Sequence, residues 1–135
     1  MELKELIKNH EGLRLNLYTC TAGKISVGYG RNLTDRGISQ REAETLLDTD
    51  IALAKQDLYD VLDSKVIDSL SDNRYMALVD MMFNLGKTRF RGFKKMIKAI
   101  KEGDWDEASR QALDSKWADQ VKSRATRDAT LIKDG

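Results

Sequence analysis

The stretch from residue 11 to residue 30, EGLRLNLYTCTAGKISVGYG, decides the fold of this chain. Leucines at positions 13, 15 and 17 alternate with other residue types, which is the period-two pattern of a strand. The same alternation returns from Ile25 to Tyr29, and residues 21–23 between the two runs have the composition of a turn. The stretch therefore predicts a β-hairpin, and we expect it to pack against a helix because two strands alone are marginally stable.

Helices are predicted on both sides of this hairpin. Before it, Leu3, Leu6, Ile7 and His10 follow helical spacing, and Gly12 is a plausible stop signal. After it, Ser39 and Glu42 form a capping box that opens a helix running to about residue 62, roughly 35 Å long. Further helices are predicted from Ser71 to Gly86, over Phe93 to Ile100 with a stop at Gly103, after the capping box Asp104–Glu107, and after a cap at Ser123.

The chain of 135 residues has the size of one domain. The order of elements predicts an α+β fold: a hairpin lobe over residues 1–38, a connecting helix over 39–62, and an all-helical lobe over 63–135. We expect Trp105 and Trp117 in its core, because aromatic residues dominate core burial.

Composition excludes several classes of function. The net charge of +1 favours no nucleic-acid partner. One cysteine rules out an intrachain disulfide and suggests a reducing compartment, and with one histidine it cannot form a usual zinc site. No apolar run approaches the roughly 20 residues of a membrane span, so we expect no stable membrane insertion. The charged N-terminus lacks the order of a secretory signal, so we expect none.

Three side chains in the decisive stretch could carry chemistry. Glu11 lies at the end of a helix beside leucines, where the helix dipole and burial against Leu13 would both raise its pKa, as a general acid requires. The alternative is a solvated surface glutamate. Cys20 could be a reactive thiol or a small buried apolar residue. Ser26, taken alone, is expected to be an exposed strand hydroxyl.

Motifs along most of the chain resemble those of the T-even-type phage lysozymes. The first is EGLRL at 11–15, followed by Tyr18, Gly23, Gly28 and Gly30. The helical part then matches at Met82-Phe83-Asn84 with Gly86, Gly92-Phe93, Trp105-Asp106-Glu107-Ala108, Ser115-Lys116-Trp117, and Arg124-Ala125 with Arg127.

The resemblance implies a lysozyme-like fold and a muramidase that needs no metal or other cofactor. It makes Glu11 the residue that protonates the glycosidic oxygen between N-acetylmuramic acid and N-acetylglucosamine. Cys20 stands where most relatives carry Asp, and Ser26 where they carry Thr. Arg124 matches an arginine that pairs with the acid, and the positions expected to touch sugar are Gly30, Asn32, Phe83, Asn84 and Gln111.

Because a thiol replaces the usual carboxylate, the chemical role of Cys20 stays open. As a thiolate, Cys20 could accept a proton from water, stabilise positive charge, or attack the anomeric carbon; the first two fit inversion and the third retention. A free thiol has a pKa near 8.5, so we hypothesise that Arg14 or Arg124 lowers it.

The biological role that the resemblance implies is lysis of a phage host. The enzyme would be a monomer that waits in the host cytoplasm, is released by a holin-type lesion, and acts on peptidoglycan in the periplasm. Two alternatives remain. One is a peptidoglycan-binding relative that is inactive because of Cys20. The other is a nucleic-acid-binding module that uses the basic residues between 87 and 101, which could also be merely a solvated helix face.

Overall fold

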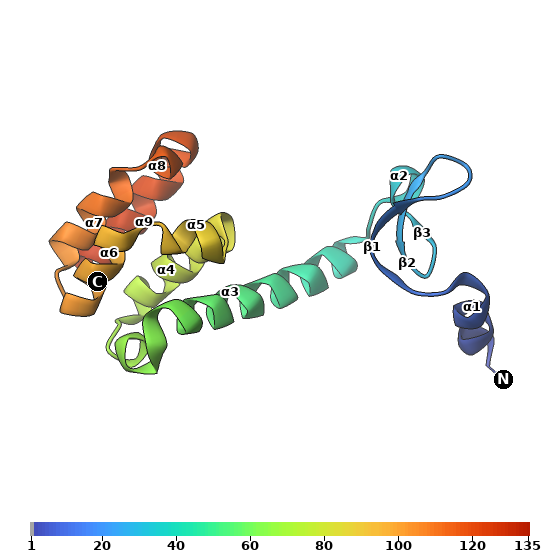
Figure 1. Ribbon diagram of the computed structural model, residues 1–135, viewed down its shortest axis with the longest axis horizontal. Coiled ribbons are helices and arrows are strands. Elements are labelled where there is room, and N and C mark those ends of the chain that lie inside the picture. Colours follow the sequence, from blue (N-terminus) through green and yellow to red (C-terminus); the bar gives the residue numbers. More distant parts are fainter. Residues whose placement is uncertain (1) are drawn as a thin grey trace. The chain divides into compact units, whose positions relative to one another are not determined.

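The computed structural model describes residues 2–135, which divide into two compact units between Leu46 and Leu47 (Figure 1). The first unit holds α1 (Leu3–Glu11), β1 (Arg14–Thr19), β2 (Ile25–Gly28), β3 (Arg31–Asn32), α2 (Leu33–Arg36) and the start of α3 (Gln40–Asp68). The second holds the rest of α3 with α4 (Asp72–Leu85), α5 (Lys87–Arg91), α6 (Lys94–Glu102), α7 (Trp105–Leu113), α8 (Lys116–Val121) and α9 (Ser123–Asp134). This mostly helical structure with one small sheet confirms the predicted α+β class.

The sheet is antiparallel with the order β1-β2-β3, so β2 is its central strand. The predicted hairpin is confirmed, but β3 was missed because two residues are too few to show a period. Two extra residues of β1 lie between its pairs Arg14↔Gly28 and Tyr18↔Ser26, which interrupts the regular ladder. The sheet packs against α2, a single turn of helix that the sequence did not predict.

The capping box at the start of α3 is confirmed in both directions. The backbone N–H of Glu42 donates to Ser39 Oγ at 3.1 Å, and the backbone N–H of Ser39 donates to Glu42 Oε1 at 2.9 Å. The predicted end near residue 62 corresponds to a break within α3, because Asp63 has a φ of 67°. The Asp63 carboxylate accepts from the N–H of Val66 at 3.1 Å and so caps the turn that follows.

The core of the helical unit lies between α3, α4, α6, α7 and α9. Trp117 is 2% exposed and belongs to this core, as predicted, and Trp105 packs partly buried against it with Arg74 4.2 Å above its ring. Other fully buried side chains are Leu58, Leu62, Leu78, Met81, Met82, Phe90, Met96 and Ile132. Burying each such large side chain contributes about 1.5–3 kcal/mol, so this unit has the apolar content of a stable domain.

The last part of the chain differs from the expectation in one detail. Ser123 is the first residue of α9, not its cap, and the cap position falls on Lys122 with a φ of 41° and no side-chain hydrogen bond. A separate short helix, α8, precedes it and is capped by the Ser115 hydroxyl, which accepts from the N–H of Ala118 at 3.1 Å. Throughout residues 2–135, none of the helices has both the length and the apolar character needed to cross a bilayer.

Candidate active site

Glu11 is the last residue of α1, and its carboxylate lies against Gly30. Gly12 ends the helix with a φ of 72°, and its N–H donates to Lys8 O at 2.9 Å. A β-carbon at Gly30 would lie 3.1 Å from Glu11 Oε2, and Gly30 also has a φ of 78°. Only glycine meets both demands without strain. The structure thus brings together two of the predicted site residues, the proton donor and one sugar-binding position.

The expected burial of Glu11 against Leu13 is wrong. Both residues are exposed, with Leu13 exposed to 53%, and Leu15 and Leu17 are exposed as well. The alternation therefore predicted the strand β1 correctly, but it does not indicate an apolar environment around the Glu11 carboxylate.

Cys20 lies just after β1, in the turn that leads to β2. Its backbone N–H donates to Lys24 O at 2.8 Å, and its carbonyl accepts from Gly23 N–H at 2.9 Å. The thiol is half-buried. Hydrogen bonds from the backbone of Lys24 and Ala22, and a smaller contribution from the Ser26 hydroxyl, lower the pKa of Cys20, while the slight burial acts against them. The turn therefore stabilises the thiolate relative to that of a free cysteine.

Ser26 is 3% exposed on the central strand β2, so the expectation of an exposed hydroxyl is wrong. It pairs with Tyr18 of β1 on one side and with Asn32 of β3 on the other, and α2 contacts the strand that carries it. Its hydroxyl is one of the groups that lower the pKa of Cys20. The structure thus brings together two further predicted residues, Cys20 and Ser26.

Arg14 does not have the role hypothesised for it. Its guanidinium lies 4.6 Å from the centre of the Tyr18 ring, a cation–π contact, and the shift at Cys20 comes from hydrogen bonds instead of from this charge. Backbone donors in a turn leave no mark in the sequence, which is why the sequence pointed to a charged residue.

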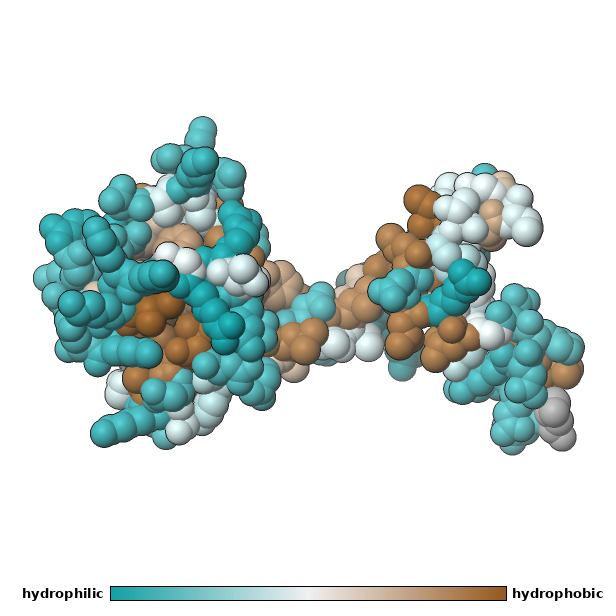
Figure 2. All heavy atoms as spheres, viewed as in Figure 1, coloured by the Kyte–Doolittle hydropathy of each residue, from teal (hydrophilic) through white to brown (hydrophobic). Residues whose placement is uncertain are grey.

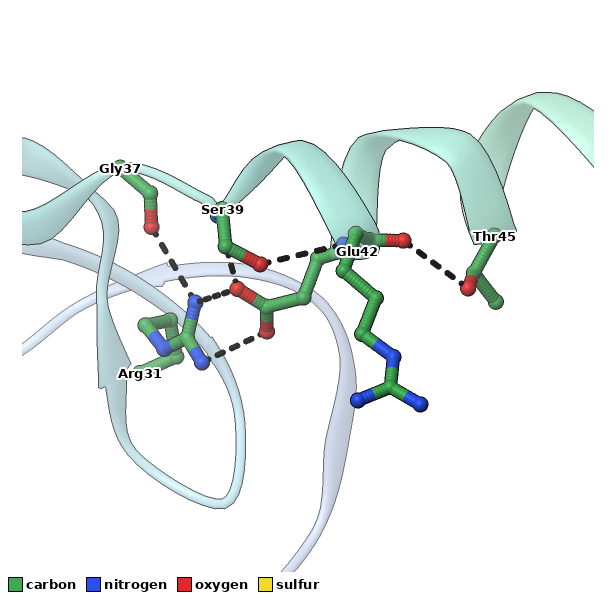
Figure 3. Close-up of polar contacts among 6 residues, drawn as sticks. Arg31, Gly37, Ser39, Glu42 and Thr45 are labelled. Atoms are coloured by element: carbon green, nitrogen blue, oxygen red, sulfur yellow. Dashed lines mark hydrogen bonds and ion pairs between the residues drawn. The ribbon is translucent and has the colours of Figure 1, made fainter.

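A forked ion pair that the sequence analysis missed joins β3 to the start of α3 (Figure 3). Arg31 Nη1 and Nη2 donate to Glu42 Oε1 and Oε2 at 2.8 Å and 2.6 Å, and Nη1 also donates to Gly37 O at 3.2 Å. These hydrogen bonds, with those from Ser39, lower the pKa of Glu42 to about 2. Arg31 follows Gly30 directly, so this pair anchors the segment that lies against Glu11.

The side chain of Asn32 has a structural role. Its side-chain oxygen accepts from the N–H of Asp35 at 3.0 Å and its amide donates to Asp35 Oδ2 at 2.8 Å, so it caps α2. A sugar at this position would compete with that cap.

In the helical unit, Phe83 and Arg124 line one pocket of about 470 Å³, together with Ile51, Tyr75 and Asp80. Phe83 is 40% exposed, which leaves its ring available at this surface. The pocket is mainly apolar, with one ion pair in its wall. This is the composition expected of a small-molecule site.

Gln111 lines a different pocket of about 560 Å³ together with Trp117 and Ser115. Its amide donates to Glu107 Oε1 at 2.7 Å. Asn84 accepts from Trp117 Nε1 at 2.7 Å, so its side-chain oxygen orients the buried indole. The predicted sugar contacts of this unit therefore fall into separate places, with Phe83 in one pocket and Gln111 in another.

Arg124 forms a paired contact with Asp80 on α4: Nε donates to Oδ2 at 3.0 Å and Nη2 to Oδ1 at 2.7 Å. Asp128, one turn further along α9, is 3% exposed. Burial, together with hydrogen bonding to Asp80, raises the pKa of Asp128 to about 8, and burial is the larger cause. Burial also acts to raise the pKa of Asp80, but the hydrogen bonds from Arg124 and Asp128 outweigh it and lower that pKa.

At neutral pH, Asp128 is therefore mainly protonated and donates to Asp80, which in turn holds Arg124. Neither carboxyl group could be predicted from sequence, since the contact spans more than 40 residues. The expected pairing of Arg124 with Glu11 stays a prediction. Nowhere in residues 2–135 do three His, Cys, Asp or Glu side chains converge as a metal site would require.

Comparison with known proteins identifies the family. Residues 8–129 match the family model described as phage lysozyme. The chain is 35% identical to an endolysin of Acyrthosiphon pisum secondary endosymbiont phage 1 over 133 residues, which cover 95% of this chain and 86% of that protein. It is 28% identical to the probable T4-type lysozyme 2 of Dictyostelium discoideum, with 98% of this chain and 94% of that protein covered.

A third relative shows the same domain inside a larger protein. The whole chain is 30% identical to a part of the pre-baseplate central spike protein of Enterobacteria phage T4, and the match covers 28% of that protein. With a family match over most of its length and with relatives that align from end to end, this chain belongs to the phage lysozyme family and is a peptidoglycan-hydrolysing glycosidase.

Proposed function

We propose that this enzyme is an endolysin that cleaves the β-1,4 bond between N-acetylmuramic acid and N-acetylglucosamine, with Glu11 as the general acid and Cys20 as the second catalytic group. The observation that carries the proposal is the lowered pKa of the Cys20 thiol beside the Ser26 hydroxyl. It gives the thiol part of the anionic character that a carboxylate would have at that position.

The proposed reaction follows the inverting course. Glu11 gives its proton to the glycosidic oxygen as the bond from that oxygen to the anomeric carbon breaks. A water attacks the opposite face of the anomeric carbon and gives its proton to the Cys20 thiolate, while Ser26 holds the thiolate by hydrogen bonding. Attack by the sulfur itself would give retention, and the configuration of the released sugar distinguishes the two.

Substrate binding is proposed for residues of both units: Gly30 beside Glu11, Asn32, Phe83 in its apolar pocket, and the amide side chains of Asn84 and Gln111. We propose that Arg124, held by Asp80, is a supporting residue. No metal or other cofactor takes part in the proposed reaction.

The proposed biological role is lysis of a bacterial host by a monomeric enzyme. It would remain in the host cytoplasm until a holin-type lesion releases it to the periplasm. The name of the 35% identical endolysin supports this role.

Clearing of a purified peptidoglycan suspension tests the catalytic proposal with four proteins: wild type, Glu11→Gln, Cys20→Ala and Cys20→Asp. We expect loss of activity of at least about 100-fold in the first two variants, as for removal of a general acid or base, and retained activity in the third. An inactive wild type alongside an active Cys20→Asp variant would instead show a relative that binds peptidoglycan without cleaving it. Unchanged activity in Cys20→Ala would remove the thiol from the mechanism.

A further inference from the structure

Seven basic side chains lie on α5 and α6, and six of them are exposed. Between residues 86 and 101 the chain has seven basic residues and no acidic one. Lys87 pairs with Asp60 at 2.9 Å, whereas the other six form no ion pair within residues 2–135. We call these six the basic face: Arg89, Arg91, Lys94, Lys95, Lys98 and Lys101.

The apolar side of α6 is already used. Met96, Ala99 and Ile100 are buried in the core of the helical unit, and the lysines lie on the opposite side of the helix. This helix therefore cannot insert an apolar side into a membrane without unfolding its unit. Whatever binds the basic face does so by charge.

The cations form a row instead of converging on one point. Arg91 ends α5, and Lys94, Lys98 and Lys101 follow at helical spacing on α6. These four cations line one groove of about 510 Å³, whose wall also contains Val61, the half-buried Ile97 and the carboxylates of Asp60 and Glu102. Figure 2 shows apolar area on the helical unit framed by hydrophilic side chains. Residues at this spacing on α6 have β-carbons about 5–6 Å apart, so their charges are spread along the helix and suit several separate anionic groups better than one small anion.

The face lacks the aromatic and amide side chains that often accompany basic residues in nucleic-acid binding. Phe90 is buried, and Phe93 packs edge-on against Trp117 with ring centres 6.3 Å apart, so neither offers a stacking surface. Residues 86–103 contain no Asn or Gln to bind base edges. With a net charge of +1, long-range attraction is weak, and at physiological salt only anions within about 8 Å of the face interact strongly.

We propose that the basic face binds the phosphate headgroups of an anionic phospholipid bilayer and adsorbs the protein to that surface without insertion. A bilayer presents a continuous layer of phosphates to an outward row of lysines. Each basic residue near such a surface contributes a roughly fivefold gain in binding, so four to six of them suffice for measurable adsorption. This inference does not depend on the proposed catalytic mechanism.

The test is cosedimentation of the full-length protein with vesicles of phosphatidylcholine alone or with about one third phosphatidylglycerol, at low and physiological salt. We expect binding to the anionic vesicles only, weakening as salt rises. The triple variant Arg91→Glu, Lys98→Glu, Lys101→Glu should lower the partition coefficient by about 100-fold or more. The matched control Lys4→Glu, Arg41→Glu, Lys65→Glu changes the net charge equally with cations outside the face and should bind nearly as wild type.

Equal loss in both triple variants would overturn the proposal, as would equal binding to neutral vesicles. Retention on duplex DNA at 0.15 M salt without vesicle binding would also overturn it and point to nucleic acid. Circular dichroism and thermal unfolding establish that each variant is folded, and the salt dependence of the wild type tests the idea without any substitution. Hydrolysis of purified peptidoglycan, measured in parallel, reports on the proposed function separately.

Discussion

Arg31 and Glu42 form a bidentate ion pair, with Nη1–Oε1 and Nη2–Oε2 distances of 2.8 Å and 2.6 Å, and this pair connects β3 to the first turn of α3. Planar guanidinium and carboxylate groups match in this way only when both are held in one orientation. Here Ser39 supplies the second constraint, since its N–H donates to the same carboxylate. The residue before Arg31 is the glycine against which Glu11 lies, so an ion pair outside the candidate active site sets the position of one of its walls.

Replacing Glu42 with Gln should change how stability depends on acid. The pKa of Glu42 is about 2 in the folded protein and roughly 4.3 in the unfolded chain, so its ionised form stabilises the fold above pH 4.3. That contribution is lost as the pH falls towards 2. We therefore expect wild type to lose more stability than Glu42→Gln between about pH 4.5 and 2, measured by urea unfolding. Glu44→Gln, two residues further along α3, is the control and should follow wild type.

Asp128 predicts a pH dependence of the opposite sign. Its pKa is raised to about 8 in the folded protein from roughly 3.9 in the unfolded chain, so the folded state binds the extra proton. Stability from this group is fully present below about pH 4 and is lost as the pH rises to 8. Asp128→Asn keeps a donor towards Asp80 and cannot ionise. We expect it to match wild type near pH 4 and to be more stable at pH 8 and above; an unchanged difference across this range would contradict the burial argument.

The single cysteine allows a direct titration of Cys20. The difference in absorbance near 240 nm between wild type and Cys20→Ala isolates the Cys20 thiolate, because the chain has no other thiol and the four tyrosines are common to both proteins. We expect the folded protein to show a pKa below that of the same protein in urea, where a value near 8.5 is normal. Ser26→Ala should move the folded value part of the way back, since the backbone of Lys24 and Ala22 remains in place. A folded value at or above the one in urea would contradict the proposed role of the turn.

Gly30→Ala separates backbone strain from the contact with Glu11. An alanine at a φ of 78° is strained by roughly 1–2 kcal/mol, and its β-carbon would press on Glu11 Oε2. Gly103→Ala is the matched control, with a φ of 72° and open space around the added carbon. We expect similar losses of thermal stability in both variants but a fall in peptidoglycan hydrolysis of tenfold or more only in Gly30→Ala.

Local signals in the sequence predicted much of the helical unit. The cap at Ser71 and the glycines at 86 and 103 end or begin helices where the structure has them, because each acts on its own backbone neighbours. The elements that were missed, β3, α2, α5 and α8, are too short for a periodic pattern.

Less of the candidate site than of the fold could be predicted from the sequence. The identities of Glu11, Cys20 and Ser26 came from the resemblance to a family, whereas their surroundings depend on contacts made by folding. Ser26 lies on the central strand between β1 and β3, and β3 was not predicted. Arg124 binds Asp80 across 44 residues of sequence, a distance at which no local rule applies.

The break at Asp63 divides α3 into two helical segments whose rotational phases are independent. Along an uninterrupted helix, one inserted residue turns everything beyond it by about 100° and would carry each buried side chain off its face. Because Asp63 leaves the helical conformation and its carboxylate starts the next turn afresh, the segment after it need not inherit that rotation. Length variation near residue 63 should consequently be absorbed within a few residues, whereas the same change beside Leu58 would misalign the core.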